Sequence, residues 1–455
     1  LGVVQLNKKN YWAALSCFTK AAIQCPRDWT NLTNLATVYV ELGGRELATS
    51  TLEQARRLKP DDPEVYATMG EIYREDREYE LAAQAFQQAL TLDPTHAVAA
   101  LGLGDCYGQL GRSSEAAAAF GKVHAMKPGS IGGLHGLAQL PASVVTIDIL
   151  AALEKVQKPS HLSEHDFRSH VAFTRAAALH RSGQHKRAWD CLVAANRIDW
   201  PTHEAEHRKE MVRQESCRSA ARELSPVQIG NQSFGTGTSP TTLFIVGASR
   251  SGKTTLERLV SELDGVKRGY ESHFVRRAVQ RASQSSGLLT LNRLTDLPKQ
   301  LDDEFSRFYL EEVRAAAGEA KILTSTNPGL IYSVGRVAAA LPSSRFVFVR
   351  RDVHDIAFRI FFKKYRSTNH YAYDLQAVFE YVAWYYEMVD IWLEKLAPIA
   401  RVVHYEEMIA DPRSALQTVA DLCNVPMPAG PLPVLGDDRG CSAPYREFMT
   451  KALEN

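Results

Sequence analysis

The sequence predicts an α-helical solenoid in the N-terminal part of the chain and an α/β domain with a parallel sheet in the C-terminal part. Three observations support this fold class. Residues 1–133 repeat with a fixed period, which is typical of stacked helical units. After residue 240, short apolar runs alternate with longer helical patterns. One of these runs leads into a glycine-rich loop and then a helix, over Leu243 to Thr255 (LFIVGASRSGKTT).

The repeated unit is 34 residues long, and three kinds of position keep this step. They are alanines at Ala14, Ala48, Ala82 and Ala116, bulky residues at Phe18, Leu52, Phe86 and Phe120, and prolines at Pro26, Pro60, Pro94 and Pro128. A unit of this length with helical apolar spacing and a terminal proline is an antiparallel helix pair. The pattern resembles the tetratricopeptide repeat, in about four copies, and we assign residues 1–140 to it. Such an array buries a continuous core and leaves a groove for a protein or peptide partner.

The repeat decays after Pro128, and a further helical pair is expected from Asp166 to Ile198. Residues 199–240 are first charged and then rich in Gly, Ser, Thr and Pro, which marks a linker. We therefore assign residues 141–235 to a divergent helical pair with its linker, and residues 240–455 to the α/β domain.

Four strands are expected in the C-terminal domain. They are Leu243–Val246, Lys321–Thr324, Arg345–Val349 and Arg401–His404. Helical patterns separate them, so the strands should be parallel and the sheet covered by helices. A ligand of such a sheet binds at the carboxyl ends of the strands.

Composition excludes a global preference for nucleic acid or membranes. The 53 Lys and Arg residues balance 52 Asp and Glu residues, for a formal net charge of +1. No apolar run is long enough to span a bilayer. The seven cysteines include no Cys-x-x-Cys pair, which favours reduced thiols and a cytoplasmic location. The chain begins at Leu1 without a methionine, inside an expected helix, so a preceding segment stays open.

The loop after the first strand has the pattern of a phosphate-binding loop. Gly247, Gly252, Lys253 and Thr254 fit Gly-x-x-x-x-Gly-Lys-Thr, and the helix that follows presents unpaired amides to an anion. Alone, this pattern indicates a nucleoside triphosphatase or kinase. That class needs Mg²⁺ on Thr254 and a carboxylate closing a second buried strand, whereas two arginines close the best such strand here.

Those arginines begin a basic segment, RFVFVRRDVHDIAFRIFFKKYR. Arg351 follows the strand, and Arg359, Lys363 and Arg366 share one face of the following helix. Charge-assisted hydrogen bonds from this face could hold a second phosphate group. A solvated basic face is the alternative interpretation.

A third segment, VVHYEEMIADP, places Tyr405 and Glu406 after another strand. The three segments together resemble the sulfotransferase superfamily over residues 243 to about 430, most closely bacterial repeat-fused sulfotransferases and tyrosylprotein sulfotransferases. The resemblance implies 3′-phosphoadenosine 5′-phosphosulfate (PAPS) as donor, adenosine 3′,5′-bisphosphate (PAP) as product and no metal. It also implies a hydroxyl acceptor on a macromolecule, with protein tyrosine favoured and a glycan second.

The resemblance also implies roles for individual residues. The loop would bind the 5′-phosphosulfate, with the charges of Arg250 and Lys253 on the sulfuryl group. Glu271 would be the general base, with His273 as a weaker substitute. The remaining donor contacts would be Ser249, Ser251, Gly252, Thr254 and Thr255 in the loop, Arg351 at the 3′-phosphate, and Tyr405 at the adenine or the 3′-phosphate. From the basic helix face, Arg359 and Lys363 are further candidates for the second phosphate group.

The sequence departs from the family at four positions. Lys253 replaces a threonine of the loop, Thr326 replaces a lysine that binds the sulfuryl group, Val353 replaces a proline, and Arg359 replaces a serine. These departures leave two alternatives open: a catalytically silent scaffold that binds partners through its repeats, and a phosphate-loop nucleotidase or kinase. Homodimerisation also stays open, and no nucleic-acid partner is expected.

Overall fold

The computed structural model describes residues 1–7, 10–42, 45–75, 78–128, 130–159, 162–225, 240–365 and 369–454. The chain forms two compact units, Leu1–Cys191 and Leu192–Asn455. The change from one unit to the other falls inside one helix, α12 (His185–Glu223). The domain limits inferred from the sequence, 1–140, 141–235 and 240–455, stay predictions.

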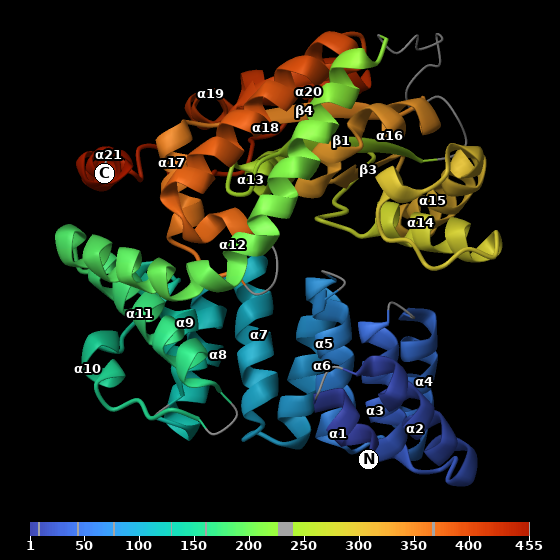
Figure 1. Ribbon diagram of the computed structural model, residues 1–455, viewed down its shortest axis with the longest axis vertical. Coiled ribbons are helices and arrows are strands. Elements are labelled where there is room, and N and C mark those ends of the chain that lie inside the picture. Colours follow the sequence, from blue (N-terminus) through green and yellow to red (C-terminus); the bar gives the residue numbers. More distant parts are fainter. Residues whose placement is uncertain are drawn as a thin grey trace. The chain divides into compact units, whose positions relative to one another are not determined.

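The first unit is entirely helical over its described residues, and consecutive helices pack against each other (Figure 1). Its helices are α1 (Gly2–Asn7), α2 (Tyr11–Gln24), α3 (Trp29–Glu41), α4 (Arg45–Leu58), α5 (Pro63–Glu75), α6 (Tyr79–Leu92), α7 (Ala97–Gln109), α8 (Ser113–Met126), α9 (Ile131–Ala138), α10 (Ile149–Leu153) and α11 (Glu164–Arg181), with a 3₁₀ turn at Ala142–Val144. The expected helical solenoid is therefore confirmed.

The repeated positions form the core of this unit. Phe86 of α6 is fully buried, and its ring fits against glycines of the two neighbouring helices. A Cβ atom at Gly70 or Gly102 would lie 2.6 or 2.4 Å from that ring, so these two positions allow the helices to approach. Ala82 and Ala116 are also fully buried, as expected where helices cross closely.

The second unit contains a sheet of five parallel strands in the order β2-β3-β1-β4-β5. The strands are β1 (Thr241–Gly247), β2 (Val266–Lys267), β3 (Ile322–Ser325), β4 (Arg345–Arg350) and β5 (Ala400–His404). Four of them confirm the predicted strands. The sequence did not indicate β2, because two residues at a sheet edge leave no apolar run.

Helices cover both faces of this sheet. After α12 they are α13 (Lys253–Val260), α14 (Phe274–Ser285), α15 (Asp302–Ala317), α16 (Val334–Ala340), α17 (Val353–Phe361), α18 (Leu375–Lys395), α19 (Tyr405–Ala410), α20 (Pro412–Cys423) and α21 (Arg446–Leu453). Short 3₁₀ turns lie at Leu294–Asp296, Lys299–Leu301, Pro328–Tyr332, His370–Tyr373 and Ala443–Tyr445. Among the described residues no helix is both long and apolar enough to cross a membrane.

The divergent helical pair extends further than expected. Its second helix, α12, continues beyond Ile198 and through Pro201 to Glu223. The expected end at Ile198 was therefore wrong, because a proline inside a helix removes one hydrogen bond without always ending the helix. The linker residues 226–239 and Arg366 lie outside the described residues.

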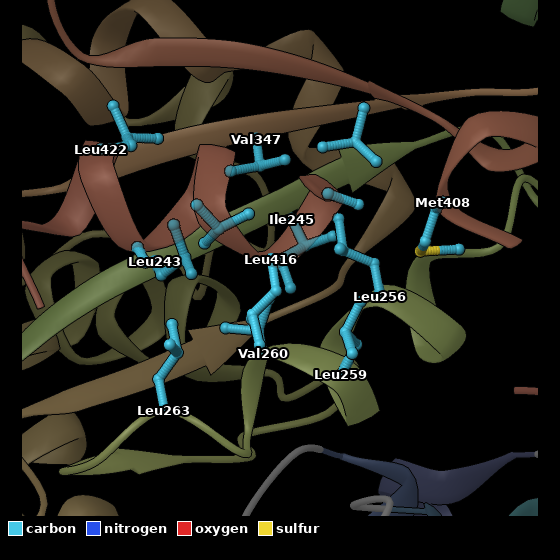
Figure 2. Close-up of a cluster of buried hydrophobic side chains, with 14 of the residues drawn as sticks. Leu243, Ile245, Leu256, Leu259, Val260, Leu263, Val347, Met408, Leu416 and Leu422 are labelled. Carbon is cyan, nitrogen blue, oxygen red and sulfur yellow. The ribbon is translucent and has the colours of Figure 1, made fainter. Parts of the chain in front are cut away.

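The core of the second unit fixes the start of α13. Leu243 and Ile245 of β1 pack on one face of the sheet against Leu256 and Val260 of α13, with side chains of α20 beside them (Figure 2). On the other face Phe244 stacks on an aromatic ring of β4 at 5.2 Å between centroids. Burial on both faces explains why β1 is a continuous apolar run.

Candidate active site

The three predicted segments meet at one edge of the sheet. Gly247 at the end of β1 pairs with Val349 of β4, and Arg350 at the end of β4 pairs with His404 of β5. The loop after β1, the arginines after β4 and the tyrosine after β5 therefore leave neighbouring parallel strands at the same end. This is the edge where an α/β sheet binds its ligand.

The loop has the backbone that its glycines were expected to allow. Gly252, which precedes α13, has a φ of 100°, and Arg250 also lies in the left-handed region with a φ of 68°. A Cβ atom at Gly247 would lie 2.4 Å from Oγ of Ser251, so the loop folds closely over the end of β1. Glycine is therefore needed at Gly252 because of its positive φ, and at Gly247 because a side chain would collide with Ser251.

Buried polar groups of this loop are unpaired within the described part of the chain. Ser251 is fully buried and its Oγ has no hydrogen-bond partner there, and the same holds for Nε of Arg250. Buried polar groups are normally paired, so unpaired donors at a helix start fit a bound anion. The loop residues thus fit a phosphate or phosphosulfate group.

The other loop residues point in different directions. Lys253 is 5% exposed, and its Nζ donates a hydrogen bond of 2.9 Å to the carbonyl of Ala248 across the base of the loop. Oγ of Ser249 lies 3.3 Å from the hydroxyl of Tyr365. Thr254 is exposed and Thr255 half-buried in the first turn of α13. The expected contact of Lys253 with a sulfuryl group stays a prediction.

Arg351 lies against the loop. Its side chain is 3% exposed, and its Nη1 is 3.4 Å from the carbonyl of Arg250. The guanidinium stacks over the ring of Tyr405 at 4.3 Å. That ring in turn fills the space beside Gly252, where a Cβ atom would approach it to 2.4 Å. The structure therefore brings the loop, Arg351 and Tyr405 together.

Tyr405 is a packed residue in this structure. It is 2% exposed, its hydroxyl donates to the carbonyl of Gly436 at 3.3 Å, and burial raises its pKa. The adjacent Glu406 accepts a hydrogen bond of 2.9 Å from the amide of Asp352 and so fixes the turn after Arg351. An adenine or phosphate contact of Tyr405 stays a prediction.

The two arginines expected at the 3′-phosphate meet at a carboxylate. Nη2 of Arg351 and Nη1 of Arg359 each lie 3.3 Å from Oδ2 of Asp438. Partial burial, and then the positive charge of Arg250, lower the pKa of Arg359, so these three arginines share one positive region. Asp438 lies in the segment between α20 and α21, which sequence reasoning did not select.

Lys363 lies further along the same segment as Arg359. Its Nζ is 5.3 Å from the centroid of the Tyr365 ring. Its expected role at a phosphate stays a prediction.

Asp355 anchors the segment that contains Asp438. It is 1% exposed and accepts hydrogen bonds from the amide and hydroxyl of Ser442, at 3.0 and 2.6 Å, and from the amide of Gly440 at 2.7 Å. Burial acts to raise its pKa, but these donors and Arg351 hold the pKa below its usual value. The signal in the sequence is a single acidic residue within a basic, apolar helix.

The proposed base, Glu271, lies in a segment that contacts the carboxyl end of β3, another strand of the same sheet. Glu271 is half-buried and follows a turn in which Tyr270 has a φ of 54°. The carbonyl of Tyr270 accepts a hydrogen bond of 2.9 Å from the amide of Thr326, the residue that replaces the family lysine. His273 precedes α14 as its cap residue. The catalytic roles of Glu271 and His273 stay predictions.

Comparison with protein families divides the chain in the same way. Residues 240–429 match the model of the sulfotransferase family, and residues 33–97 and 73–140 match two models of the tetratricopeptide repeat. These matches confirm that repeats precede a sulfotransferase domain in one chain.

Several solved structures resemble parts of the chain. A sulfotransferase from Alicyclobacillus acidocaldarius is 16% identical over 48% of this chain and 94% of its own, with a TM-score of 0.31. The sulfotransferase domain from the curacin biosynthetic pathway is 15% identical over 44% of this chain and 80% of its own, with a TM-score of 0.30. PilW, a type IV pilus biogenesis factor, is 22% identical over 43% of this chain and 90% of its own, with a TM-score of 0.35.

Proposed function

Because the chain joins tetratricopeptide repeats to a domain of the sulfotransferase family, we propose that it transfers a sulfuryl group from PAPS to a hydroxyl of a macromolecular acceptor. Protein tyrosine is the favoured acceptor and a glycan the second. One observation supports this donor above others: Arg351 and Arg359 converge on an anionic group beside a loop with unpaired buried donors. A donor with phosphate groups at both the 3′ and 5′ positions suits two adjacent anion sites.

The residues present fit this donor. Ser251, Arg250 and the amides at the start of α13 would hold the 5′-phosphosulfate. Arg351 and Arg359 would hold the 3′-phosphate in exchange for the carboxylate of Asp438. The bound donor supplies a sulfuryl group attached to a good leaving group.

The side chains then have separate tasks in a direct transfer. Glu271 takes the proton of the acceptor hydroxyl while that oxygen forms its bond to sulfur. The bond between sulfur and the bridging phosphate oxygen breaks, and Arg250 stabilises the negative charge left on that oxygen. Lys253 would leave the carbonyl of Ala248 and supply to the sulfuryl oxygens the charge that Thr326 lacks. The products are a sulfate ester, PAP and a protonated Glu271.

A nucleotidase or kinase has less support. Such an enzyme needs a carboxylate free to hold Mg²⁺ after the second strand. Asp352, the nearest candidate, accepts the amide of Asp355 at 3.0 Å as a helix cap and pairs with Arg446 at 3.1 Å. Its carboxylate is already used in holding α17 and α21.

A binding experiment tests the donor. We expect calorimetry to show PAP binding at least about tenfold more tightly than ATP with Mg²⁺, since two arginines meet its 3′-phosphate. Arg351→Lys should weaken PAP binding about tenfold because lysine cannot replace a planar guanidinium with several partners. The matched control is Arg413→Lys on the exposed surface of α20, which should leave binding unchanged. Tighter binding of ATP with Mg²⁺ would favour the nucleotidase.

A transfer experiment tests the activity. Labelled PAPS is incubated with the full chain and either a tyrosine peptide or an oligosaccharide. We expect labelled peptide, and we expect Glu271→Ala to abolish labelling while PAP binding persists. Glu262→Ala, at an exposed position, is the control. A protein that binds PAP but labels no acceptor would favour the silent scaffold.

The repeats are the proposed docking site for the acceptor or a partner protein. A cavity of about 720 Å³ lies among α6, α7 and α8. Its lining includes the polar side chains of Gln84, Gln87, Tyr107 and Lys122. Polar side chains at repeat surfaces suit the backbone and polar groups of an extended peptide.

A further inference from the structure

We propose that Glu257 is a positioning residue that holds Glu271 in place relative to the phosphate-binding loop. Glu257 lies in α13, the helix that begins at this loop, and does not itself contact the reacting atoms. The inference rests on the proposed function, in which Glu271 is the base. It adds a residue that neither the loop pattern nor the family resemblance selected.

Glu257 is a buried acid with three donors from two other segments, β3 and residues 268–270. Its side chain is 1% exposed. Oε1 accepts the hydroxyl of Thr324 in β3 at 2.5 Å and the amide of Tyr270 at 2.8 Å, and Oε2 lies 3.4 Å from Nη2 of Arg268. Acidic side chains are seldom fully buried without such partners. Glu257 thus connects the loop helix, the neighbouring strand and the segment that leads to Glu271.

The same contacts define the backbone of the turn before Glu271. The hydroxyl of Thr324 has one proton, which it gives to Glu257, so it accepts the amide of Gly269 at 3.0 Å. The carbonyl of Tyr270 accepts from Thr326 at 2.9 Å. The amide of Gly269 is therefore bound by β3, the amide of Tyr270 by Glu257, and the carbonyl of Tyr270 by the residue that follows β3.

This turn has a conformation that needs such support. Tyr270 has a φ of 54°, which is unfavourable for a residue with a side chain. A Cβ atom at Gly269 would lie 2.1 Å from the carbonyl of Thr324, so the turn presses directly on β3. A strained turn persists only where its surroundings hold it in place. Here the group that holds it is the carboxylate of Glu257, on the helix that begins at the loop.

Fixing the turn matters because transfer depends on geometry. A base displaced by about 1 Å can lose about a hundredfold in rate. Burial raises the pKa of Glu257 although its three donors oppose the shift. In either protonation state Oε1 can accept the amide of Tyr270, so the positioning contact does not require the charge.

The test compares four variants of the full chain. Glu257→Gln keeps an oxygen acceptor, Glu257→Leu removes it, and Thr324→Val removes the bridging hydroxyl without changing the shape. Glu312→Gln is the matched control, because this half-buried acid pairs with Arg277 at 2.7 Å in an ion pair between α14 and α15. The measurements are transfer from labelled PAPS to the tyrosine peptide, PAP binding by calorimetry, and hydrogen exchange of residues 266–273.

We expect Glu257→Leu and Thr324→Val to lower kcat about tenfold or more, with PAP affinity and donor KM within about twofold of wild type. Exchange at the Tyr270 amide should accelerate about tenfold in both variants. Glu257→Gln should retain most of the rate because its amide oxygen preserves the contact. Glu312→Gln should change none of the three measurements.

Two outcomes would overturn the positioning role while the proposed function stands. One is a normal kcat in Thr324→Val and Glu257→Leu. The other is a loss of PAP affinity in step with kcat, because the loop itself would then be disturbed. If Glu257→Leu does not fold, Thr324→Val decides. A wild type that binds PAP and labels no acceptor would instead overturn the proposed function, and this role with it.

Discussion

Arg351 and Arg359, on the strand end and the helix that follows it, approach the same oxygen of Asp438 at 3.3 Å each. Two guanidinium groups this close repel each other unless an anion lies between them. The carboxylate thus keeps the pair together. A phosphate group of the donor would provide the same neutralisation with more acceptor oxygens.

Removing this carboxylate should tighten donor binding. In Asp438→Asn the arginines keep their positions but lose the competing charge, so PAP should bind about fivefold more tightly, the size of a partly exposed ion pair. Calorimetry with PAP measures the change. Asp437→Asn is the control, because Asp437 pairs with Arg439 instead. Weaker binding in Asp438→Asn would mean that the carboxylate organises the site.

Lys253 should affect transfer more than binding. Lys253→Met keeps the length of the buried side chain and removes its charge. We expect the transfer rate from labelled PAPS to fall about tenfold or more while PAP affinity changes little, because PAP lacks the sulfuryl group. If Lys253 acts only through its hydrogen bond to Ala248, PAP affinity and thermal stability should fall together instead.

Gly252 should tolerate no side chain. In Gly252→Ala the new Cβ atom would lie 2.4 Å from the ring of Tyr405 at a φ of 100°. We expect the free energy of unfolding to fall by about 2 kcal/mol and PAP binding to be lost. Gly121→Ala in α8 is the matched control, since no atom lies within 4 Å of its added Cβ. It should be neutral or raise stability by up to about 1 kcal/mol. Chemical denaturation of both variants checks this.

Asp355 should give the second unit an acid-sensitive part of its stability. Its pKa is lowered from 3.8 in the folded state, so its contribution is complete above that value and is lost as pH falls through the folded pKa. The difference in unfolding free energy between wild type and Asp355→Asn should therefore be largest near neutral pH and shrink below about pH 3.8. Urea unfolding followed by the fluorescence of buried Trp384 and Trp392 measures it. A difference that does not change with pH would contradict the assignment.

Most of the fold could be predicted from the sequence, because it depends on local periodicity. The step of 34 residues identified the repeats, and four apolar runs identified strands whose observed ends differ by at most two residues from those expected. Not every element was predicted. The strand β2 is too short for a pattern, and α12 continues through Pro201 because packing along a long helix can outweigh one missing hydrogen bond.

The site could be predicted only where function lies in contiguous motifs. Gly252, Arg351 and Tyr405 follow three strands, and the sheet necessarily gathers them. Asp438 and Glu257 have no such signal, since their roles depend on partners that only the folded chain brings near. The sequence does contain one clue to Glu257. It lies between Leu256 and Val260 on the apolar face of α13, and a buried acid at such a position requires a hydrogen-bond partner.

The strand order determines when each part of the chain can fold during synthesis. Each repeat contacts mainly its neighbours along the sequence, so the helical array can form while the ribosome is still producing the rest. The central strand β1 cannot, because its two partners, β3 and β4, are made later, and β5 must follow before β4 is enclosed. Nascent chains therefore carry an apolar strand that lacks at least one partner until His404 has emerged, and a chaperone would be most useful before that point.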